Sequence, residues 1–172
     1  YPYRITHPRE DNFGIGLFSK HPFKKSSVSS VGHAEIPTCL AVIGFPETDL
    51  FVIGTHPLPP GGWRRTYLRN QQLEALGALV REATQSAILM GDLNVTPWSY
   101  HFKELLGTSG LLDSGRGWGF QPTWSANNPL LWIPIDHFLH SGEIRVVHRE
   151  IGPDVGSDHY PLIVHFTLGQ KE

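Results

Sequence analysis

Near its end the chain reads Ser157-Asp158-His159-Tyr160-Pro161-Leu162, in which a carboxylate and an imidazole stand directly before an apolar run. Two earlier stretches have the same character: Gly91-Asp92-Leu93-Asn94 follows an apolar run, and Ile135-Asp136-His137 precedes one. Short apolar runs bounded by glycine and polar residues are typical of buried strands. We therefore expect these polar groups to lie at strand ends, where one sheet presents them to a common cleft. Such a set suits hydrolysis of a phosphate ester.

Size and composition indicate one soluble globular domain spanning residues 1–172. Of the 172 residues, 40% are hydrophobic and 17% are charged, as in ordinary folded proteins. No segment approaches the roughly 18 consecutive apolar residues that cross a bilayer. The net charge is −2 at pH 7, so no global attraction to nucleic acid is expected. DNA and a compact phosphorylated substrate both stay open.

The single cysteine and the first residue bear on cellular context. Cys39 lies within an apolar run, so we expect a buried thiol and no intramolecular disulfide. The sequence begins at Tyr1 without methionine, which indicates a processed product or a piece of a longer protein. The compartment is left open, and one alternative is a bacterial parent anchored in a membrane through an upstream segment.

The hydrophobic pattern predicts strands with helices inserted between them. Apolar, β-branched or aromatic runs predict strands at residues 13–19, 39–44, 50–55, 86–90, 135–140, 145–150 and 160–168. A looser alternation predicts a more exposed strand at residues 27–36. Together with the helices, this order predicts an α/β fold built as a two-sheet sandwich.

Two segments have helical features. Leu73, Leu76 and Val80 recur at helical spacing within residues 66–84, which places Arg69 and Gln72 on the other faces of that helix. Thr96 followed by Pro97 predicts the start of a second, shorter helix that runs to about residue 106. Residues 107–134, rich in glycine, serine, proline and tryptophan, are expected to form a long ordered loop region, and such loops often have a functional role.

Asp92 and Asn94 are two residues apart, so both side chains should lie on the same side of the backbone as it leaves its strand. A carboxylate there can orient water and a carboxamide can donate to a phosphate oxygen. The alternative is an ordinary turn in which both groups bond to the backbone. In Asp158-His159, a carboxylate can face a cation while the imidazole faces a nucleophilic water. A loop cap beside a surface histidine is the alternative.

Asp136 lies between Ile135 and the run His137-Phe138-Leu139, a setting in which its carboxylate needs a partner. A histidine partner would become oriented and more basic. His56 follows the strand at residues 50–55 and should lie at its carboxyl edge. Arg65 and Arg69, with Arg64, form a basic cluster that can bind one or two phosphates. The alternative is that they lie in the exposed first turn of a helix and only aid solubility.

The long loop also contains aromatic residues that could contact a substrate. Trp124 can stack on a base or an apolar headgroup, or it can fill the edge of a cleft.

The order of these motifs resembles the endonuclease/exonuclease/phosphatase superfamily, which has the deoxyribonuclease-like fold. The resemblance rests on Thr55-His56-Pro57, Gly91-Asp92-Leu93-Asn94, Ile135-Asp136-His137 and the stretch from Gly156 to Leu162. It extends to residues 12–23, which are similar to the strand before the histidine strand, and to the Arg-x-x-Gln-Leu pattern at residues 69–73. Each motif is weak alone, and the combination in this order is specific.

The resemblance implies metal-dependent hydrolysis of a phosphodiester or phosphomonoester. By motif, His159 would be the general base on water and Asp136 would orient it. Asp92 and Asn94 would hold the nucleophile and the phosphate, and His56 would stabilise the phosphate or the leaving oxygen.

The resemblance also implies a divalent cation and a substrate class. Asp158 would contribute to a site for Mg²⁺ or Mn²⁺, because these ions prefer oxygen ligands. The substrate would be a phosphate ester, whether nucleic acid, phospholipid or a small phosphate.

The chain also departs from the family pattern. A first strand ending in asparagine and a second ending in Gln-Glu are missing, so the resemblance covers the carboxyl-terminal two-thirds of such a domain, incomplete at the N-terminus. We expect weak metal binding and slow or absent turnover, and a non-catalytic binding or scaffold domain is the alternative function. Residues 162–166 would be an unprotected sheet edge, which predicts self-association.

Overall fold

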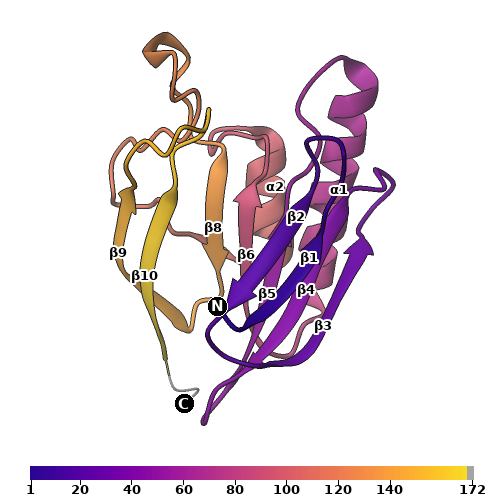
Figure 1. The fold of residues 1–172 in the computed structure, drawn as a ribbon, viewed down its shortest axis with the longest axis vertical. Helices are drawn as coiled ribbons and strands as arrows, with labels where there is room; N and C mark the ends of the chain where they lie inside the picture. Colours follow the sequence, from indigo (N-terminus) through magenta and orange to yellow (C-terminus); the bar gives the residue numbers. More distant parts are fainter. Residues whose placement is uncertain (170–172) are drawn as a thin grey trace.

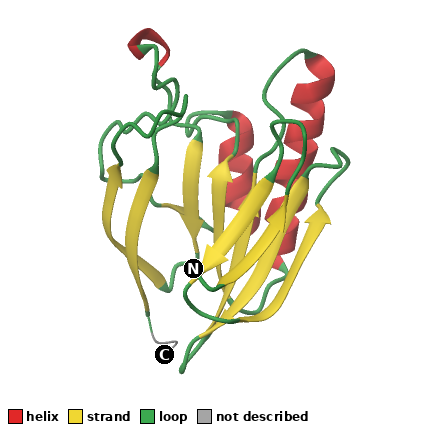
Figure 2. Cartoon of the chain, in the orientation of Figure 1, coloured by secondary structure: helices red, strands yellow, loops and turns green. Residues whose placement is uncertain are grey.

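The computed structural model describes residues 1–169, which form layered strands with helices on one side (Figures 1 and 2). The strands are β1 (Tyr3–His7), β2 (Ile15–Ser19), β3 (Phe23–Ser30), β4 (Pro37–Gly44), β5 (Asp49–Thr55), β6 (Ser86–Asp92), β7 (Leu112–Asp113), β8 (Asp136–His140), β9 (Ile144–Ile151) and β10 (Leu162–Leu168). The helices are α1 (Trp63–Arg81) and α2 (Tyr100–Ser109), and a short 3-10 helix, η1, covers Pro129–Leu131.

Six strands form a mixed sheet in the order β3-β4-β5-β6-β8-β7. Strands β5 and β6 are parallel because α1 carries the chain back between them, and the other neighbours are antiparallel. Helices α1 and α2 cover one face of this sheet, and two antiparallel pairs, β1-β2 and β9-β10, lie over the other (Figure 1). The predicted α/β sandwich is confirmed, with a second layer made of two separate halves.

The face of the sheet toward the helices is closed by a continuous apolar core. Leu89 of β6 and Leu139 of β8 pack there with Leu76 of α1 and Phe102 of α2, and all four are almost completely buried. A strand buried on both faces needs apolar residues at successive positions, which explains the uninterrupted apolar run before Gly91.

The opposite face of the sheet has a second core that is less completely covered. Ile88 and Phe138 project to this side because successive side chains of a strand point to opposite faces. They pack against Leu17 of β2, while Leu162 and Val164 of β10 join the cluster with their side chains only partly buried. The second layer therefore shields its core less well than the helices shield theirs.

The predicted strands are confirmed within a few residues, with three differences. One is the short β7, which lies in residues 107–134, a segment expected to be loop, and pairs with β8. Strand β1 was not expected, because apolar residues alternate only weakly in Tyr3–His7. These residues form a strand by pairing with β2. Strand β3 was expected at residues 27–36 but ends at Ser30, where it pairs with Pro37 at the start of β4. The intervening residues form the connection between β3 and β4, and Gly32 takes a positive φ of 77° there.

The second helix begins later than expected. The Thr96-Pro97 pair forms a turn in which the Ser99 amide donates to the Thr96 carbonyl at 3.0 Å. Helix α2 then starts with Ser99 as its N-cap and ends at Ser109, beyond the predicted residue 106. A proline fits a turn as well as a first helical position, so the local pattern does not separate the two.

The first helix is confirmed, but two of its polar residues are buried where exposure was expected. Gln72 is fully buried and donates through Nε2 to the Thr55 hydroxyl at 3.3 Å. Arg69 is only 8% exposed. Among residues 1–169, no helix has both the length and the apolar character needed to span a membrane.

We expect Leu139→Ala to lower the free energy of unfolding by about 2–5 kcal/mol, because it leaves a cavity in a closed core. Urea unfolding followed by circular dichroism measures this loss. Leu130→Ala is the matched control, since Leu130 is 94% exposed and its truncation should change stability by no more than about 0.5 kcal/mol. Equal losses in the two variants would contradict the assignment of the core.

Candidate active site

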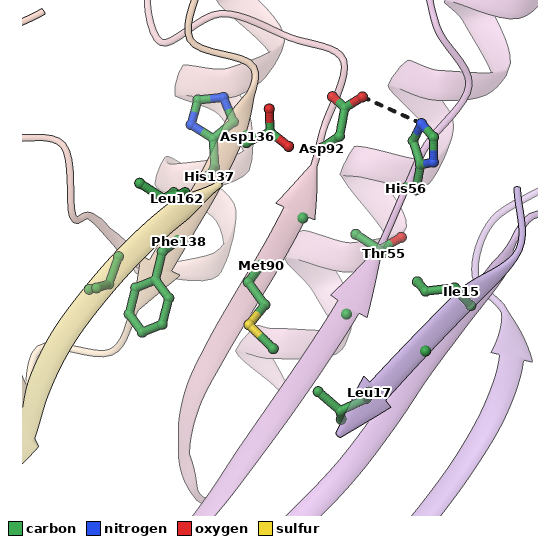
Figure 3. Close-up of a pocket in the computed structure, with 14 residues that line it drawn as sticks. Ile15, Leu17, Thr55, His56, Met90, Asp92, Asp136, His137, Phe138 and Leu162 are labelled. Carbon is green, nitrogen blue, oxygen red and sulfur yellow. Dashed lines mark ion pairs between the residues drawn. The ribbon is translucent and has the colours of Figure 1, made fainter. Parts of the chain in front are cut away.

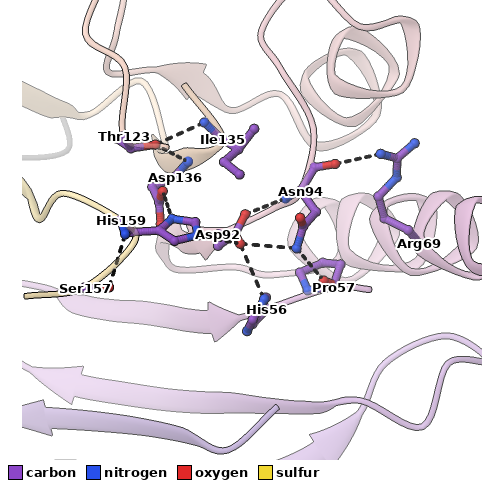
Figure 4. A network of polar contacts seen from close by, with 10 residues as sticks. All are labelled: His56, Pro57, Arg69, Asp92, Asn94, Thr123, Ile135, Asp136, Ser157 and His159. Atoms are coloured by element: carbon purple, nitrogen blue, oxygen red, sulfur yellow. Dashed lines mark hydrogen bonds and ion pairs between the residues drawn. The ribbon is translucent and has the colours of Figure 1, made fainter. Parts of the chain in front are cut away.

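The predicted site residues come together at one edge of the six-stranded sheet (Figure 4). His56 follows β5, Asp92 ends β6 and Asp136 begins β8, while His159 lies in the loop before β10. Parallel strands end at the same edge of a sheet, and an antiparallel neighbour begins there. This topology places four side chains from distant segments around one point.

Asp92 and Asp136 lie directly opposite each other in the antiparallel pair formed by β6 and β8. Gly91, immediately before Asp92, has a φ of 137°, and a Cβ at this position would lie against the carbonyl oxygen of Thr55. Glycine therefore permits a close approach of β6 to the end of β5. That approach sets the distance between Asp92 and His56.

Asn94 is held in the left-handed region, with a φ of 51°, by hydrogen bonds on both sides. Its backbone amide donates to Asp92 Oδ1 at 2.8 Å, and its Nδ2 donates to the Pro57 carbonyl at 3.0 Å and to Asp92 Oδ2 at 3.2 Å. Arg69 Nη1 donates to the Asn94 carbonyl at 2.6 Å. Asp92 and Asn94 thus lie together as expected, in a turn whose bonds also position the carboxylate.

His159 is fixed by Asp136 through a hydrogen bond of 2.7 Å between Nδ1 and Asp136 Oδ2. With Nδ1 donating, the neutral ring has its lone pair on Nε2, which lies 3.8 Å from Asp92 Oδ2. The expected histidine partner of the half-buried Asp136 carboxylate is therefore His159.

The pKa of His159 is raised above its usual 6.5, first by the hydrogen bond to Asp136 and then by the nearby negative charges, which outweigh partial burial. A raised folded-state pKa stabilises the folded protein fully below about pH 6.5, and this contribution is lost as the pH rises through the folded-state pKa. The neutral ring, which can accept a proton, becomes dominant only above that pKa.

Thr123 supports this arrangement and was not anticipated from the sequence. Its buried hydroxyl accepts hydrogen bonds from the backbone amides of Ile135 and Asp136, both at 3.1 Å, and its carbonyl accepts the Tyr160 amide at 2.8 Å. One threonine thus links the start of β8 to the segment containing His159. No motif marks it, because its role depends on a contact between distant loops.

His56 lies on the other side of Asp92, with Nε2 3.4 Å from Asp92 Oδ2. The Phe13 ring packs on the imidazole with a centroid separation of 5.2 Å. This contact limits how far the ring can turn, so His56 presents one nitrogen to the shared carboxylate.

A cleft of about 990 Å³ opens over these residues. It is lined by eight of the nine predicted site residues: His56, Arg65, Arg69, Asp92, Asn94, Trp124, Asp158 and His159. Asp136, the ninth, contacts the cleft through His159. The sequence motifs therefore converge on one hollow.

Arg69 and Arg65 reach this cleft in different ways. Two of the Arg69 nitrogens donate to Asn70 Oδ1, and a third holds the Asn94 carbonyl. Arg65 is exposed at the rim. Arg65 therefore has more freedom than Arg69 to meet a negatively charged group.

The oxygen donors in the cleft partly match a divalent cation. Asp92 and Asp158 both line it, and Mg²⁺ is often bound through one or two carboxylates together with water and substrate phosphate oxygens. Within residues 1–169 no group of three or more His, Cys, Asp or Glu side chains is arranged to hold a metal ion. Asp92 and Asp158 therefore offer two of the oxygen ligands that Mg²⁺ takes, and water and substrate oxygens would have to supply the others.

Comparison with known proteins identifies the family. The Endonuclease/Exonuclease/phosphatase family profile matches residues 1–159, and the chain belongs to this family. No curated protein matches the sequence.

Solved structures share the fold at low sequence identity. An endonuclease/exonuclease/phosphatase from Beutenbergia cavernae is 22% identical with a TM-score of 0.73, covering 91% of this chain and 48% of that protein. A 3′ phosphatase from Neisseria, bound to a product DNA hairpin, is 17% identical with a TM-score of 0.79, covering 96% and 79%. Sphingomyelinase C from Streptomyces griseocarneus is 18% identical with a TM-score of 0.62, covering 88% and 67%. This chain thus spans about half the length of the first of these proteins.

We expect Gly91→Ala to lower the free energy of unfolding by about 1–3 kcal/mol, because alanine cannot take this backbone geometry beside the Thr55 carbonyl without strain. Urea denaturation measures the change. Gly107→Ala is the control, since Gly107 lies in α2 with open space around its Cα, and alanine there should stabilise the helix. A Gly91→Ala protein as stable as the parent would refute the close approach of the two strands.

Proposed function

We propose that this domain hydrolyses a phosphate ester, with His159 as the general base and Asp136 as the residue that orients it. The supporting observation is the 2.7 Å contact between His159 Nδ1 and Asp136 Oδ2 at the edge of a cleft lined by Asp92 and Asn94. A ring held through Nδ1 keeps Nε2 available to take a proton from the attacking water. The family name also covers endonucleases, exonucleases and phosphatases, all of which act on phosphate esters.

The remaining polar groups would stabilise the charge that develops during attack on phosphorus. Asp92, with both oxygens engaged by Asn94, would help to orient the water beside His159. His56, 3.4 Å from the same carboxylate, would donate to a phosphate oxygen or to the leaving oxygen. Preorganised donors of this kind lower the barrier because they need no rearrangement in the transition state.

Metal dependence is part of the proposal. Asp158 and Asp92 would hold Mg²⁺ or Mn²⁺ together with oxygens from the substrate and water. When bound, such an ion offsets negative charge on the phosphoryl group. The residues of the chain would still hold the water and move its proton.

The proposed substrate class is a phosphate ester with groups that extend beyond the phosphate. Arg65 at the rim would meet a second phosphate, and Arg69 lines the same wall. Trp124, which lines the same cleft, would contact a base or an apolar headgroup. Nucleic acid, phospholipid and small phosphates all fit this description.

A non-catalytic binding domain is the second candidate. It is favoured by one observation: the described residues, 1–169, include no group of three or more side chains able to hold a metal ion by themselves. Such a domain would bind a phosphorylated partner in the same cleft without turning it over.

A substrate panel tests the proposed function. We expect the purified chain with Mg²⁺ to hydrolyse at least one of bis(p-nitrophenyl) phosphate, p-nitrophenyl phosphate, a DNA oligonucleotide or sphingomyelin vesicles. His159→Ala should lower that rate by about 10²- to 10⁴-fold, because it removes the base, and chelation with EDTA should lower it as well. Binding of these compounds with no turnover by the parent protein would favour the non-catalytic alternative.

The pH profile tests the His159–Asp136 pair separately. The active ring is neutral and its pKa is raised, so kcat/KM should increase with pH through a pKa above the usual 6.5. In Asp136→Asn the carboxylate that raises this pKa is gone. The acid limb should therefore move to lower pH, and the plateau should fall because the ring is less well oriented.

Asp49→Asn is the control for this measurement. Asp49 begins β5, at the opposite end of the strand from His56, and its carboxylate pairs with Lys24. Its removal should leave the acid limb unchanged. An identical profile for Asp136→Asn and the parent would rule out Asp136 as the partner that sets the basicity of His159.

A further inference from the structure

Arg69 is a buried arginine in the wall of the cleft that has no acidic partner. Its side chain is only 8% exposed, and it lines the cleft together with Asn94, whose carbonyl it contacts (Figure 4). Burial lowers the pKa of Arg69, and no carboxylate among residues 1–169 raises it again. A buried charge is usually paired with an opposite one, so the absence of such a partner here is unusual.

Arg149, which is also buried, has the more common arrangement. Its Nε donates to the Ser114 hydroxyl at 3.2 Å, and its Nη1 donates to Gln121 Oε1. The negative charge of Asp113 raises the pKa of Arg149 against the effect of burial. Arg149 is not among the residues that line the cleft. The buried arginine without an acidic neighbour is therefore the one that lines the cleft.

Asn70 holds the Arg69 guanidinium through a neutral group. Arg69 Nε and Nη2 donate to Asn70 Oδ1 at 3.0 and 2.8 Å, and Nη1 donates to the Asn94 carbonyl at 2.6 Å. An aspartate in place of Asn70 could accept the same two hydrogen bonds, but its charge would cancel that of Arg69. The amide therefore fixes the direction of the guanidinium and leaves its positive charge uncompensated.

A histidine of α2 fixes the orientation of the Asn70 amide. Because Asn70 Oδ1 accepts from Arg69, the Asn70 Nδ2 donates to His101 Nε2, at 2.9 Å. With Nε2 accepting, His101 Nδ1 donates to Glu104 Oε2 at 3.1 Å. The Glu104 side chain is 50% exposed and is separated from Arg69 by a histidine and an amide. Solvent therefore screens the one carboxylate of this chain of contacts.

The acidic residues of the cleft give an uncompensated positive charge a use. Asp11, Asp92 and Asp158 line the same cleft, and their charges repel an entering phosphate. A positive charge that is already paired with a carboxylate adds little attraction for an anion. The charge of Arg69 is buried, so solvent screens it less than it would screen an exposed charge.

We infer that Asn70 is a positioning residue that holds Arg69 as an uncompensated positive charge for a phosphate group in the cleft. Its oxygen also directs the guanidinium to the Asn94 carbonyl, which supports the turn that holds Asp92. The inference rests on the proposed function in so far as both place a phosphate in the cleft. Asn70 lies between Arg69 and Gln72, at a position that the Arg-x-x-Gln-Leu pattern leaves open.

A phosphate titration tests the electrostatic role of Asn70. The probe is inorganic phosphate with Mg²⁺, added to the isotopically labelled chain and followed by NMR. Asn70→Asp is combined with His101→Gln, so that the histidine cannot take up a compensating proton. Compared with His101→Gln alone, the double variant should raise the Kd for phosphate at least about tenfold, because the new carboxylate cancels the Arg69 charge at hydrogen-bond distance.

Gln71→Glu is the matched control for the added charge. It places a carboxylate at the next residue of α1, whose side chain bonds to Glu74 at the surface and does not line the cleft. Because solvent screens an exposed charge, it should change the Kd by less than about twofold. Equal increases in Gln71→Glu and the double variant would overturn the inference. An unchanged Kd in the double variant would also overturn it, as would a parent chain that does not bind phosphate.

Asn70→Ala separates orientation from charge. It removes both hydrogen bonds to Asn70 Oδ1 but leaves the Arg69 charge, so the turn that holds Asp92 loses support. On the panel substrate that is hydrolysed, kcat should fall about tenfold while KM changes less than about threefold. The double variant should instead raise KM. A kcat equal to that of the parent would overturn the orienting role. If circular dichroism shows that Asn70→Ala is unfolded, the titration of the double variant decides.

Turnover separates this inference from the proposed function. Weaker phosphate binding in the double variant, together with hydrolysis by the parent chain, supports both. The same weakening without hydrolysis by the parent supports the role of Asn70 and counts against the proposed function. Hydrolysis by the parent with an unchanged Kd in the double variant supports the proposed function and overturns the inference.

Discussion

The register between β6 and β8 is the constraint on which the site depends. It places Asp92 directly opposite Asp136, and a slip of either strand by one residue would turn that strand's carboxylate to the other face of the sheet. Two carboxylates in this position repel each other unless a cation or hydrogen-bond donors offset their charge. The imidazole of His159 meets this need, because it bonds to Asp136 and faces Asp92. The raised pKa of His159 is therefore a consequence of the strand register.

Hydrogen bonds from neighbouring loops hold the two carboxylates in place. Asp92 is held on one side by Asn94, whose own carbonyl is fixed by Arg69. Asp136 is held through its backbone by Thr123. Each carboxylate is thus oriented by a different loop, so the distances among Asp92, Asp136 and His159 depend on loops that are distant in sequence. Rigid support of this kind would suit the role proposed for His159, because a general base must be held in place beside its water molecule.

The two faces of the six-stranded sheet differ in a way that matters for function. The face under α1 and α2 is a closed core and supplies most of the apolar burial. The opposite face is covered by two strand pairs, and a cavity with apolar residues in its middle and polar residues at one end lies between them (Figure 3). Asp92 and His56 line this cavity as well as the cleft.

The local sequence determined the element types and the polar groups at strand ends. The runs before Gly91 and around Phe138 predicted buried strands, because a strand buried on both faces is apolar at successive positions. The setting of Asp136 predicted a hydrogen-bond partner for its carboxylate, because a buried carboxylate requires one. The family resemblance, and not the local pattern, pointed to His159 as this partner. The tertiary structure alone decided that Arg69 and Gln72 are buried, that Thr96-Pro97 forms a turn, and that β1 is a strand. Each of these depends on contacts between segments far apart in the chain. A local pattern indicates a residue's conformational preference, but it does not indicate which distant residue will contact it.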